Sequence, residues 1–259
     1  MIKQRITVTI AAAAAAGLAL ALSACGGSSS PKLTHVFTTV PWTGNETLNY
    51  DIVDQGGDLT GVCQLETKVD TSPGKTTLVQ DCSNAGDNEP GRYRDDRTAI
   101  VDSKTLKPFS ATRTTSDAKK DTRTTFTSTY SPTEVKFQAN DNGTLHGTNR
   151  DLPKPSDSSP DPGYYDDEEL FWIIRGIPLE KDWEGAYIDV NASNGQTITA
   201  RIRVEDQEKV TVPAGTFNVW KVRLSTSSVT QFFWIDASPP HHVIQADIED
   251  TTYKLKSAK

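Results

Sequence analysis

The sequence predicts a mainly β protein in which a curved antiparallel sheet, or an incomplete barrel, wraps around one helix at about residues 166–175. Short segments of alternating apolar and polar residues recur along the chain, separated by turns rich in Gly, Pro, Asn and Asp. One segment, Leu170–Ile174, is apolar at every position. A helix without a polar face must be buried on all sides. A sheet that encloses such a helix also limits exposed strand edges.

The first 24 residues are typical of an export signal. Lys3 and Arg5 supply positive charge ahead of an apolar stretch. The stretch ends in Leu22-Ser23-Ala24-Cys25, which resembles the lipobox of bacterial lipoproteins. This resemblance implies cleavage before Cys25 and a diacylglyceryl thioether on its sulfur; the alternative is an ordinary secretory peptide. We therefore expect a membrane partner through lipid on Cys25, at the extracytoplasmic face of the cell membrane.

The residues that follow predict a short tether and one domain. Residues 25–32 are rich in Gly and Ser and should be flexible, with a reach of at most ~28 Å. Residues 33–259 show no composition shift and should form a single β-rich domain. Without residues 1–24 the chain has 25 basic and 34 acidic side chains, a net charge of −9. This balance argues against nucleic acid as a partner.

Cys63 and Cys82 are candidates for a disulfide. They flank the turn sequence Thr71-Ser72-Pro73-Gly74. If residues 71–74 form a hairpin loop, the two cysteines lie directly opposite each other at a Cα separation of ~4.5–5.5 Å, which a disulfide can span. Closing this loop would contribute roughly 3 kcal/mol. The alternative is two free thiols in a reducing cytosol, but the export signal favours the disulfide.

The alternation of apolar and polar residues predicts strands on both sides of the helix in the sequence. Ahead of the helix we expect strands over residues 47–53, 59–69, 76–81, 98–101, 109–115, 123–130 and at 135–137, the last leading into an Asn142-Gly143 hairpin turn. After the helix we expect strands over residues 196–205, 210–212, 217–224, 229–235, 243–248 and 252–255.

The helix has start and stop signals at both ends. Asp166 is the expected N-cap, with Glu169 as the return partner of a capping box. Arg175 falls in the last turn, Gly176 is placed for a left-handed residue after the helix, and Pro178 prevents continuation. We expect Arg175 to cap the helix C-terminus; an anion site inside a pocket is the alternative. The competing structure for the whole segment is a buried strand.

Neither a catalytic residue, a metal nor a cofactor is expected. The sequence contains no zinc-protease helix, phosphate loop or nucleophile elbow. His241 and His242 are adjacent and would point to opposite faces of a strand, so they are poorly placed to bind one metal. A group of acids could suggest calcium but lacks the alternating spacing of a calcium loop, and a solvated loop leading into a capped helix is favoured: Asp157, Asp161, Asp166, Asp167, Glu168 and Glu169.

Several aromatic side chains around the helix are candidates for lining an apolar pocket. The alternative is that they only fill the core. They are Phe171, Trp172, Trp220, Phe233 and Trp234.

The chain resembles a family of exported bacterial proteins of unknown function. The matching residues are Glu46–Tyr50, Val101–Pro108, Arg175–Leu179, Val210–Phe217 and Phe233–Asp236. The resemblance implies a curved antiparallel sheet around a helix, similar to the carriers that shuttle lipoproteins across the periplasm. It transfers no catalytic residue, because the family has no settled activity. The disulfide hairpin is not part of the resemblance.

These observations favour a membrane-anchored, non-catalytic envelope lipoprotein that binds an apolar or lipid-like ligand or assists envelope traffic. The alternative is a non-catalytic interaction module with a solid core and an exposed patch, for example on the threonine-rich strands of residues 109–130. An enzyme is the third hypothesis, and it would gain support if His242 lay close to a carboxylate such as Asp247.

Overall fold

The computed structural model describes residues 32–85, 90–193 and 195–259. The described residues belong to one of the two units into which the chain divides, Pro31–Lys259. Within the described residues, no helix has the length and apolarity needed to cross a membrane.

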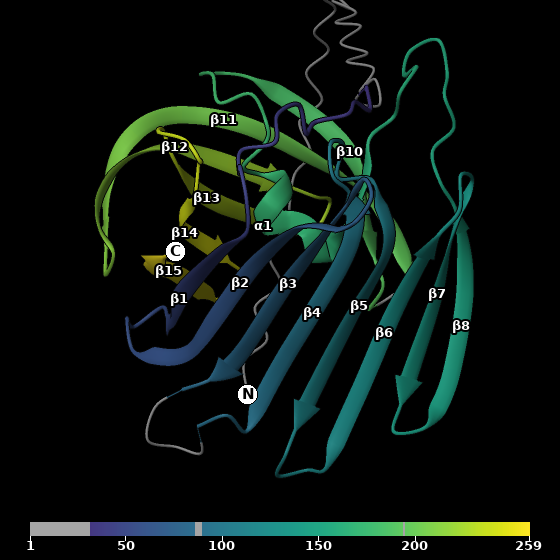
Figure 1. The fold of residues 1–259 in the computed structure, drawn as a ribbon, viewed down its shortest axis with the longest axis horizontal. Coiled ribbons are helices and arrows are strands. Elements are labelled where there is room, and N and C mark those ends of the chain that lie inside the picture. The colour runs from purple at the N-terminus through teal and green to yellow at the C-terminus, as the bar shows by residue number, and fades with distance from the viewer. Residues whose placement is uncertain (1–31, 86–89, 194) are drawn as a thin grey trace, which may run out of the picture. The chain divides into compact units, whose positions relative to one another are not determined.

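The described residues of this unit form fifteen strands and one short helical segment (Figure 1). The strands before the helical segment are β1 (Glu46–Asp54), β2 (Leu59–Ser72), β3 (Lys75–Asn84), β4 (Tyr93–Asp102), β5 (Pro108–Asp117), β6 (Thr122–Tyr130), β7 (Glu134–Asp141), β8 (Thr144–Asp151) and β9 (Tyr164–Asp166). The helical segment is a 3-10 turn, η1 (Asp167–Glu169), followed by α1 (Leu170–Ile173). The strands after it are β10 (Glu184–Asn191), β11 (Gln196–Val212), β12 (Gly215–Ser225), β13 (Thr230–Asp236), β14 (Val243–Ile248) and β15 (Thr251–Ala258).

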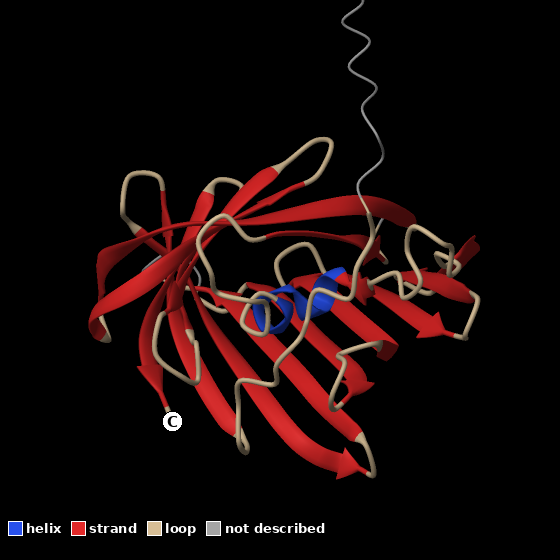
Figure 2. Cartoon of the chain, turned by 90° about the horizontal axis from the view of Figure 1, so that it is seen from above, coloured by secondary structure: helices blue, strands red, loops and turns tan. Residues whose placement is uncertain are grey.

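All fifteen strands belong to one sheet made of two meanders. Its order is β8-β7-β6-β5-β4-β3-β2-β1-β15-β14-β13-β12-β11-β10-β9, so strands that are neighbours in the sheet are also consecutive in sequence, except for the pair β1 and β15. Every pair is antiparallel apart from β9 with β10. Figures 1 and 2 show the sheet bending around α1, with the helix inside the curve. The predicted fold class is therefore confirmed.

The two ends of the sheet, β8 and β9, do not pair with each other, so the barrel is incomplete. Side chains bridge the opening instead. Val135 and Phe137 on β7 pack with Val190 on β10 in a small second core. The Tyr130 ring on β6 stacks on that of Tyr164 on β9, with centroids 6.2 Å apart. The ends are thus held together by packing, without ladder hydrogen bonds.

The predicted helix is present but shorter than residues 166–175. Leu170–Ile174 are all buried, as a helix without a polar face requires, and the buried-strand alternative is wrong. The N–H groups of Arg175 and Gly176 donate to the carbonyls three residues earlier, at 3.2 and 3.1 Å. The helix therefore tightens and ends at its fourth residue, with Pro178 close behind.

Gly176 was expected to be left-handed, and this is wrong, because its φ is not positive. The structure gives another reason for glycine. A Cβ at this position would lie 2.1 Å from Cε2 of Phe37 and 2.6 Å from the carbonyl oxygen of Thr39. The carbonyl oxygen of Gly176 itself accepts hydrogen bonds from the N–H groups of Thr38 and Thr39, at 2.8 and 3.1 Å. Gly176 is therefore required by the close approach of residues 37–39.

The predicted cross-strand disulfide between Cys63 and Cys82 is present, with a Cα separation of 4.1 Å. The turn itself is two residues tighter than expected, since Ser72 pairs with Lys75. A register shift between Lys68 and Ser72 compensates, so that 63 still faces 82. The alternation of apolar residues determines the register of β2 against β3, because a shift of one strand by one residue would turn its buried side chains outward.

Three strands were not predicted. Strand β8 is exposed along its whole length and carries no apolar alternation. Strand β9 has only three residues. Strand β10 contains a Glu, a Gly and an Asp among its apolar residues, which hides its period of two.

Candidate functional site

The start of the helical segment places acidic side chains in the interior of the curved sheet. Asp166 is fully buried and caps η1 as predicted: its Oδ1 accepts a hydrogen bond from the N–H of Glu168 at 3.1 Å. Its Oδ2 accepts a second one from the hydroxyl of Tyr130 at 2.6 Å. Burial nevertheless raises the pKa of Asp166 to about 6, because hydration of the charged form is lost.

In the predicted capping box, the return contact from Glu169 to the N–H of Asp166 falls short of a hydrogen bond of normal geometry. Neither carboxyl oxygen of Glu169 makes a hydrogen bond of normal geometry within the described residues. The N–H of Asp166 is close enough to lower the pKa of Glu169 slightly, but burial dominates and raises it well above its ordinary value. The reason is tertiary: the side chain is fully buried, and the neighbouring Asp166 and Asp189 carboxyls oppose its ionisation.

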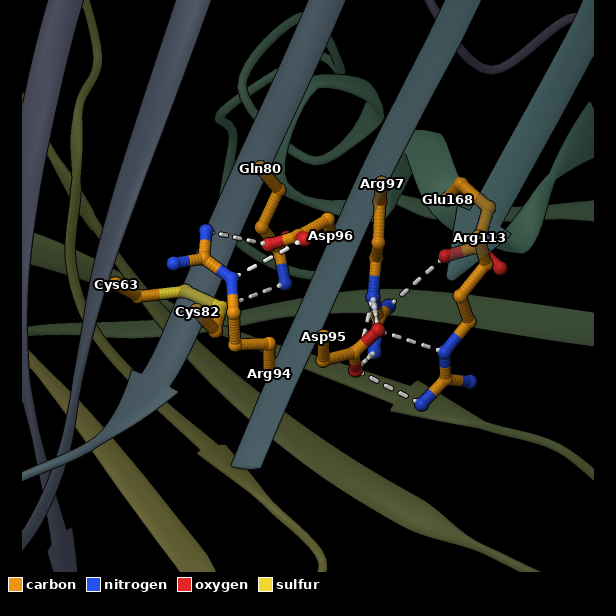
Figure 3. The surroundings of a disulfide bond; sticks show 9 residues. All are labelled: Cys63, Gln80, Cys82, Arg94, Asp95, Asp96, Arg97, Arg113 and Glu168. Carbon is orange, nitrogen blue, oxygen red and sulfur yellow. Dashed lines mark hydrogen bonds and ion pairs between the residues drawn. A yellow bond between two sulfur atoms is a disulfide. The ribbon is translucent and has the colours of Figure 1, made fainter. Parts of the chain in front are cut away.

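An ion-pair cluster from the adjacent strands faces the start of the helical segment (Figure 3). Arg97 on β4 contacts Glu168 through Nη1 at 3.1 Å and Asp95 through Nη2 at 2.7 Å. Arg113 on β5 donates two hydrogen bonds of 2.9 Å to the same Asp95. The two arginines are cross-strand partners, which is why one carboxylate can hold both.

Acids outnumber the two arginines in this region. Burial raises the pKa of Glu168 to about 8, although the neighbouring Arg97 lowers it in part. Burial also raises the pKa of Asp167 and that of Asp189 on β10. Ionisation of several carboxyl groups is therefore disfavoured in this interior.

A cavity of about 520 Å³ lies beside this cluster. Its walls come from both meanders and from the helical segment. Its charged side chains are Asp95, Arg97, Arg113, Asp167, Asp189 and Glu249. Its aliphatic and aromatic side chains are Leu170, Phe171, Tyr187, Ile198, Leu224, Val229, Ile248 and Tyr253. The cavity is thus amphipathic: charged side chains line it on β4 and β5, α1 contributes apolar ones, and strands β10–β15 contribute both polar and apolar ones.

Of the five aromatic residues expected to line a pocket, only Phe171 borders this cavity. The Phe233 ring packs edge-on behind it, with centroids 6.0 Å apart. The indole N–H of Trp172 donates to the hydroxyl of Thr67 at 2.8 Å. Trp220 packs at the border of the core, and Trp234, which is buried, donates its indole N–H to Glu208. These last four residues therefore do not line the cavity.

Arg175 does not cap the helix. Its guanidinium is 2 % exposed and forms a two-pronged ion pair with Glu46 on β1, the second prong being 3.1 Å long. It also donates to the carbonyl oxygens of Pro240 and His241, each at 3.1 Å. The pKa of Glu46 falls to about 2, because hydrogen bonds from His242 and Arg175 overcome the cost of burial. Arg175 therefore fastens the helix exit to β1 and to the loop before β14.

The two histidines have different partners. Nε2 of His242 lies 3.5 Å from the Glu46 carboxylate, not beside Asp247 as considered from the sequence. His241 has a positive φ of 55°, and its Nδ1 lies 2.9 Å from the carbonyl oxygen of Asp236. No group of three or more potential metal-binding His, Cys, Asp or Glu side chains occurs among the described residues.

The disulfide lies on the inner face of the sheet, and its Cys82 on β3 is next to the ion-pair cluster on β4. Gln80, which borders the cavity, donates its side-chain amide to Sγ of Cys82 at 3.3 Å. Asp95 is the cross-strand neighbour of Cys82 on β4. The covalent link therefore stiffens the wall that carries Asp95 and Arg97. The predicted lipid anchor, Cys25, lies outside the described residues.

The charged wall was missed from the sequence. Asp95 and Arg97 share the inward face with Ala99 and Val101, but a strand was expected only over residues 98–101. Extending the same period of two backwards would have placed both charges inside. Arg113 follows Ala111 on the inward face of β5 in the same way. Charged residues in the inward phase of a strand are the signal that sequence reasoning could have used.

Comparisons with known proteins locate the chain among uncharacterised ones. A family model described as a protein of unknown function (DUF3108) matches residues 45–253. No curated protein matches the chain.

Solved structures with a similar fold include a β-barrel-like protein of a domain of unknown function (DUF1849) from Brucella abortus. It is 13% identical, covers 83% of this chain and 97% of its own, and has a TM-score of 0.48. A provisionally assigned exported protein with a YmcC-like fold from Bacteroides fragilis is 11% identical over 89% of this chain and 100% of its own, with a TM-score of 0.34. A provisionally assigned lipoprotein from Parabacteroides distasonis is 12% identical over 86% of this chain and 99% of its own, with a TM-score of 0.29.

Proposed function

This chain belongs to DUF3108, a family of proteins of unknown function, and we propose that it is a lipid-anchored protein of the cell envelope that binds a small amphipathic molecule without transforming it. The anchor is the lipid implied by the lipobox at Cys25, which places the folded unit on the extracytoplasmic face of the cell membrane. The binding site is the interior cavity between the sheet and α1.

The observation that supports this function is the size and lining of the cavity. About 520 Å³ is within the range of small-molecule sites, and the lining combines an apolar part with a larger number of polar and charged side chains. A solid core, which the alternative of a pure interaction module requires, would leave no such space. The same alternative also requires a contiguous exposed patch. The large exposed apolar side chains are instead spread over four strands: Leu59 and Val62 on β2, Tyr93 on β4, Phe109 on β5 and Leu145 on β8.

The lining favours an amphipathic ligand over a wholly apolar one. An apolar molecule filling the cavity would strip water from Asp95 and Arg113 without replacing the lost hydrogen bonds, which costs several kcal/mol for charged groups. A ligand with one polar end could place that end on the β4–β5 wall and its apolar part against Phe171 and Leu224. The expectation of an apolar or lipid-like ligand is thereby narrowed to a molecule with a head group.

The residues around His242 do not favour catalysis. The Glu46 carboxylate accepts hydrogen bonds from Arg175 and from the hydroxyl of Thr67, the latter at 3.0 Å. A carboxylate held on both oxygens, with a pKa of about 2, is a poor general base at neutral pH. The His242–Glu46 contact therefore serves the attachment of the helix exit.

Native mass spectrometry of the lipidated protein, extracted from membranes in mild detergent, tests this function. We expect a bound molecule in addition to the mass of the lipidated chain, and we expect solvent extraction to release it. A matched pair of variants on β13 identifies its location. Gln231→Trp fills the cavity, which Gln231 borders, whereas Thr230→Trp adds the same bulk to the exposed face. Retention of the molecule by both variants, or its absence from the wild type, would refute the proposal.

A further inference from the structure

We propose that a basic groove on the outer face of β10–β12 rests on anionic lipid head groups of the membrane that holds Cys25. This inference relies on the lipid anchor of the proposed function but not on the cavity ligand. The groove has a volume of about 620 Å³ and is bordered by Lys32, Arg201, Arg203 and Arg223, with Glu184 as its one acidic side chain.

The arginines point outward because their neighbours fill the core. Ile202 and Val204 on β11 and Leu224 on β12 are buried on the inner face, so the alternating residues 201, 203 and 223 face outward. The cross-strand pairing of Arg203 with Arg223 brings two of these cations directly together. Like charges opposite each other on neighbouring strands are destabilising unless another charge compensates them.

The compensation inside the protein is partial. Arg203 forms ion pairs with Asp182 at 2.8 Å and Glu184 at 3.0 Å, and Arg223 lies 3.5 Å from Glu205. Within the described residues, Arg201 and Lys32 form no ion pair. Positive charge thus remains unmatched at the Lys32 end of the groove, in a chain whose other side chains give a net negative charge.

The unmatched end of the groove is also where the chain leaves toward the anchor. The N–H of Thr34 donates to the carbonyl of Ala186 on β10 at 2.8 Å, which fixes this segment beside the groove. Gly163 packs against the same segment so closely that a Cβ would lie 2.0 Å from the Thr34 carbonyl oxygen. Residues 25–32 form the tether between Cys25 and the groove, and a fully extended tether of this length reaches at most ~28 Å.

This placement selects a membrane surface as the partner. Attraction between basic side chains and anionic head groups extends over about one Debye length, ~8 Å at physiological salt. A free protein with excess negative charge would be repelled by such a surface, but the short tether holds the groove close to it. The remaining acidic surface would then turn away from the membrane, which orients the folded unit.

Arginine-specific labelling of the lipidated protein in vesicles tests this proposal. Phenylglyoxal modification of Arg201 is followed by peptide mass spectrometry, with Arg150 on the exposed β8 strand as the internal control. In vesicles containing about one-third phosphatidylglycerol we expect Arg201 to react at least about threefold more slowly than in phosphatidylcholine vesicles, and we expect high salt to remove the difference. Arg150 should react equally in both. Equal rates for Arg201, or matching protection of Arg150, would overturn the proposal.

Two further arms identify the cause of the protection. In Arg201→Glu, protection of Arg223 should be lost, whereas Arg150→Glu should leave it intact; protection that survives Arg201→Glu contradicts the proposal. Glycerol phosphate added to phosphatidylcholine vesicles should not protect Arg201, and protection by it would make the groove a site for a soluble anion. If the protein fails to float with the vesicles, the anchor is absent and this inference fails, while the cavity ligand can still be detected by mass spectrometry.

Discussion

At the scale of single residues, the helix exit depends on one buried ion pair. Arg175 and Glu46 are more than a hundred positions apart in sequence, and their side chains are 1% and 10% exposed. A buried charge is tolerated only when its partner is present, because the cost of dehydration is otherwise unrecovered. Arg175 also supplies hydrogen bonds to the carbonyls of Pro240 and His241, so its loss leaves acceptors unsatisfied as well.

We therefore expect Arg175→Ala to lower the free energy of unfolding by roughly 3–5 kcal/mol, the range for breaking a buried pair from one side. Urea denaturation followed by circular dichroism measures this loss. The double variant Arg175→Met with Glu46→Gln removes both charges and should recover part of the stability. Exposed Arg150→Ala is the control and should change stability by less than about 0.5 kcal/mol. A near-neutral Arg175→Ala would show that the pair does not hold the helix exit.

The disulfide is a second contact at this scale. Cys63→Ser together with Cys82→Ser should lower the free energy of unfolding by about 3 kcal/mol, because the unfolded chain regains the entropy of a loop that spans 19 positions. The same denaturation experiment measures it, and adding a reductant to the wild type should lower stability in a similar way. Reductant should leave the double variant unchanged. A stability loss in the variant but none on reduction would place the effect in side-chain packing.

At the scale of elements, the start of the helical segment makes stability depend on pH. Glu168 has a pKa of about 8 in the folded protein against an ordinary value of 4.5, so the folded state holds its proton more tightly. The contribution of this proton to the free energy of unfolding is fully present below pH 4.5 and is lost as the pH rises through 8. Asp166, with a pKa of about 6, changes stability in the same direction over a lower range of pH. Glu46, at about 2, has the opposite sign and loses its contribution only as the pH falls from 4.5 through 2.

The free energy of unfolding should accordingly decline by a few kcal/mol between pH 5 and pH 9, at about 1.4 kcal/mol per unit of pKa shift. Glu168→Gln keeps the shape of the protonated side chain and should flatten this decline. Glu180→Gln, at an exposed position after the helix, should leave the decline intact. Chemical denaturation at a series of pH values measures all three proteins. A decline of equal slope in Glu168→Gln would remove Glu168 as its cause.

At the scale of the whole molecule, the architecture could be predicted because it follows from local patterns. The all-apolar run at Leu170–Ile174 requires burial on every side, and the regular alternation of strands such as β11 supplies a wall with one apolar face. The cavity could not be predicted, since it depends on how far the two meanders stand apart. Its charged wall was hidden because Asp95 and Arg97 occupy inward positions that a pattern of apolar residues does not register. The partners of Arg175 were out of reach for a related reason, because Glu46 and Pro240 approach it only through tertiary packing.

The central claim is that the space beneath α1 holds an amphipathic ligand. The most direct measurement is the affinity of a fluorescent single-chain phospholipid for the purified lipidated protein, titrated for the wild type, Gln231→Trp and Thr230→Trp. We expect Gln231→Trp to weaken binding at least about tenfold, since its indole occupies the cavity, and we expect Thr230→Trp, on the opposite face of the same strand, to bind as the wild type does. Equal affinities for the wild type and Gln231→Trp, with both proteins folded, would contradict it.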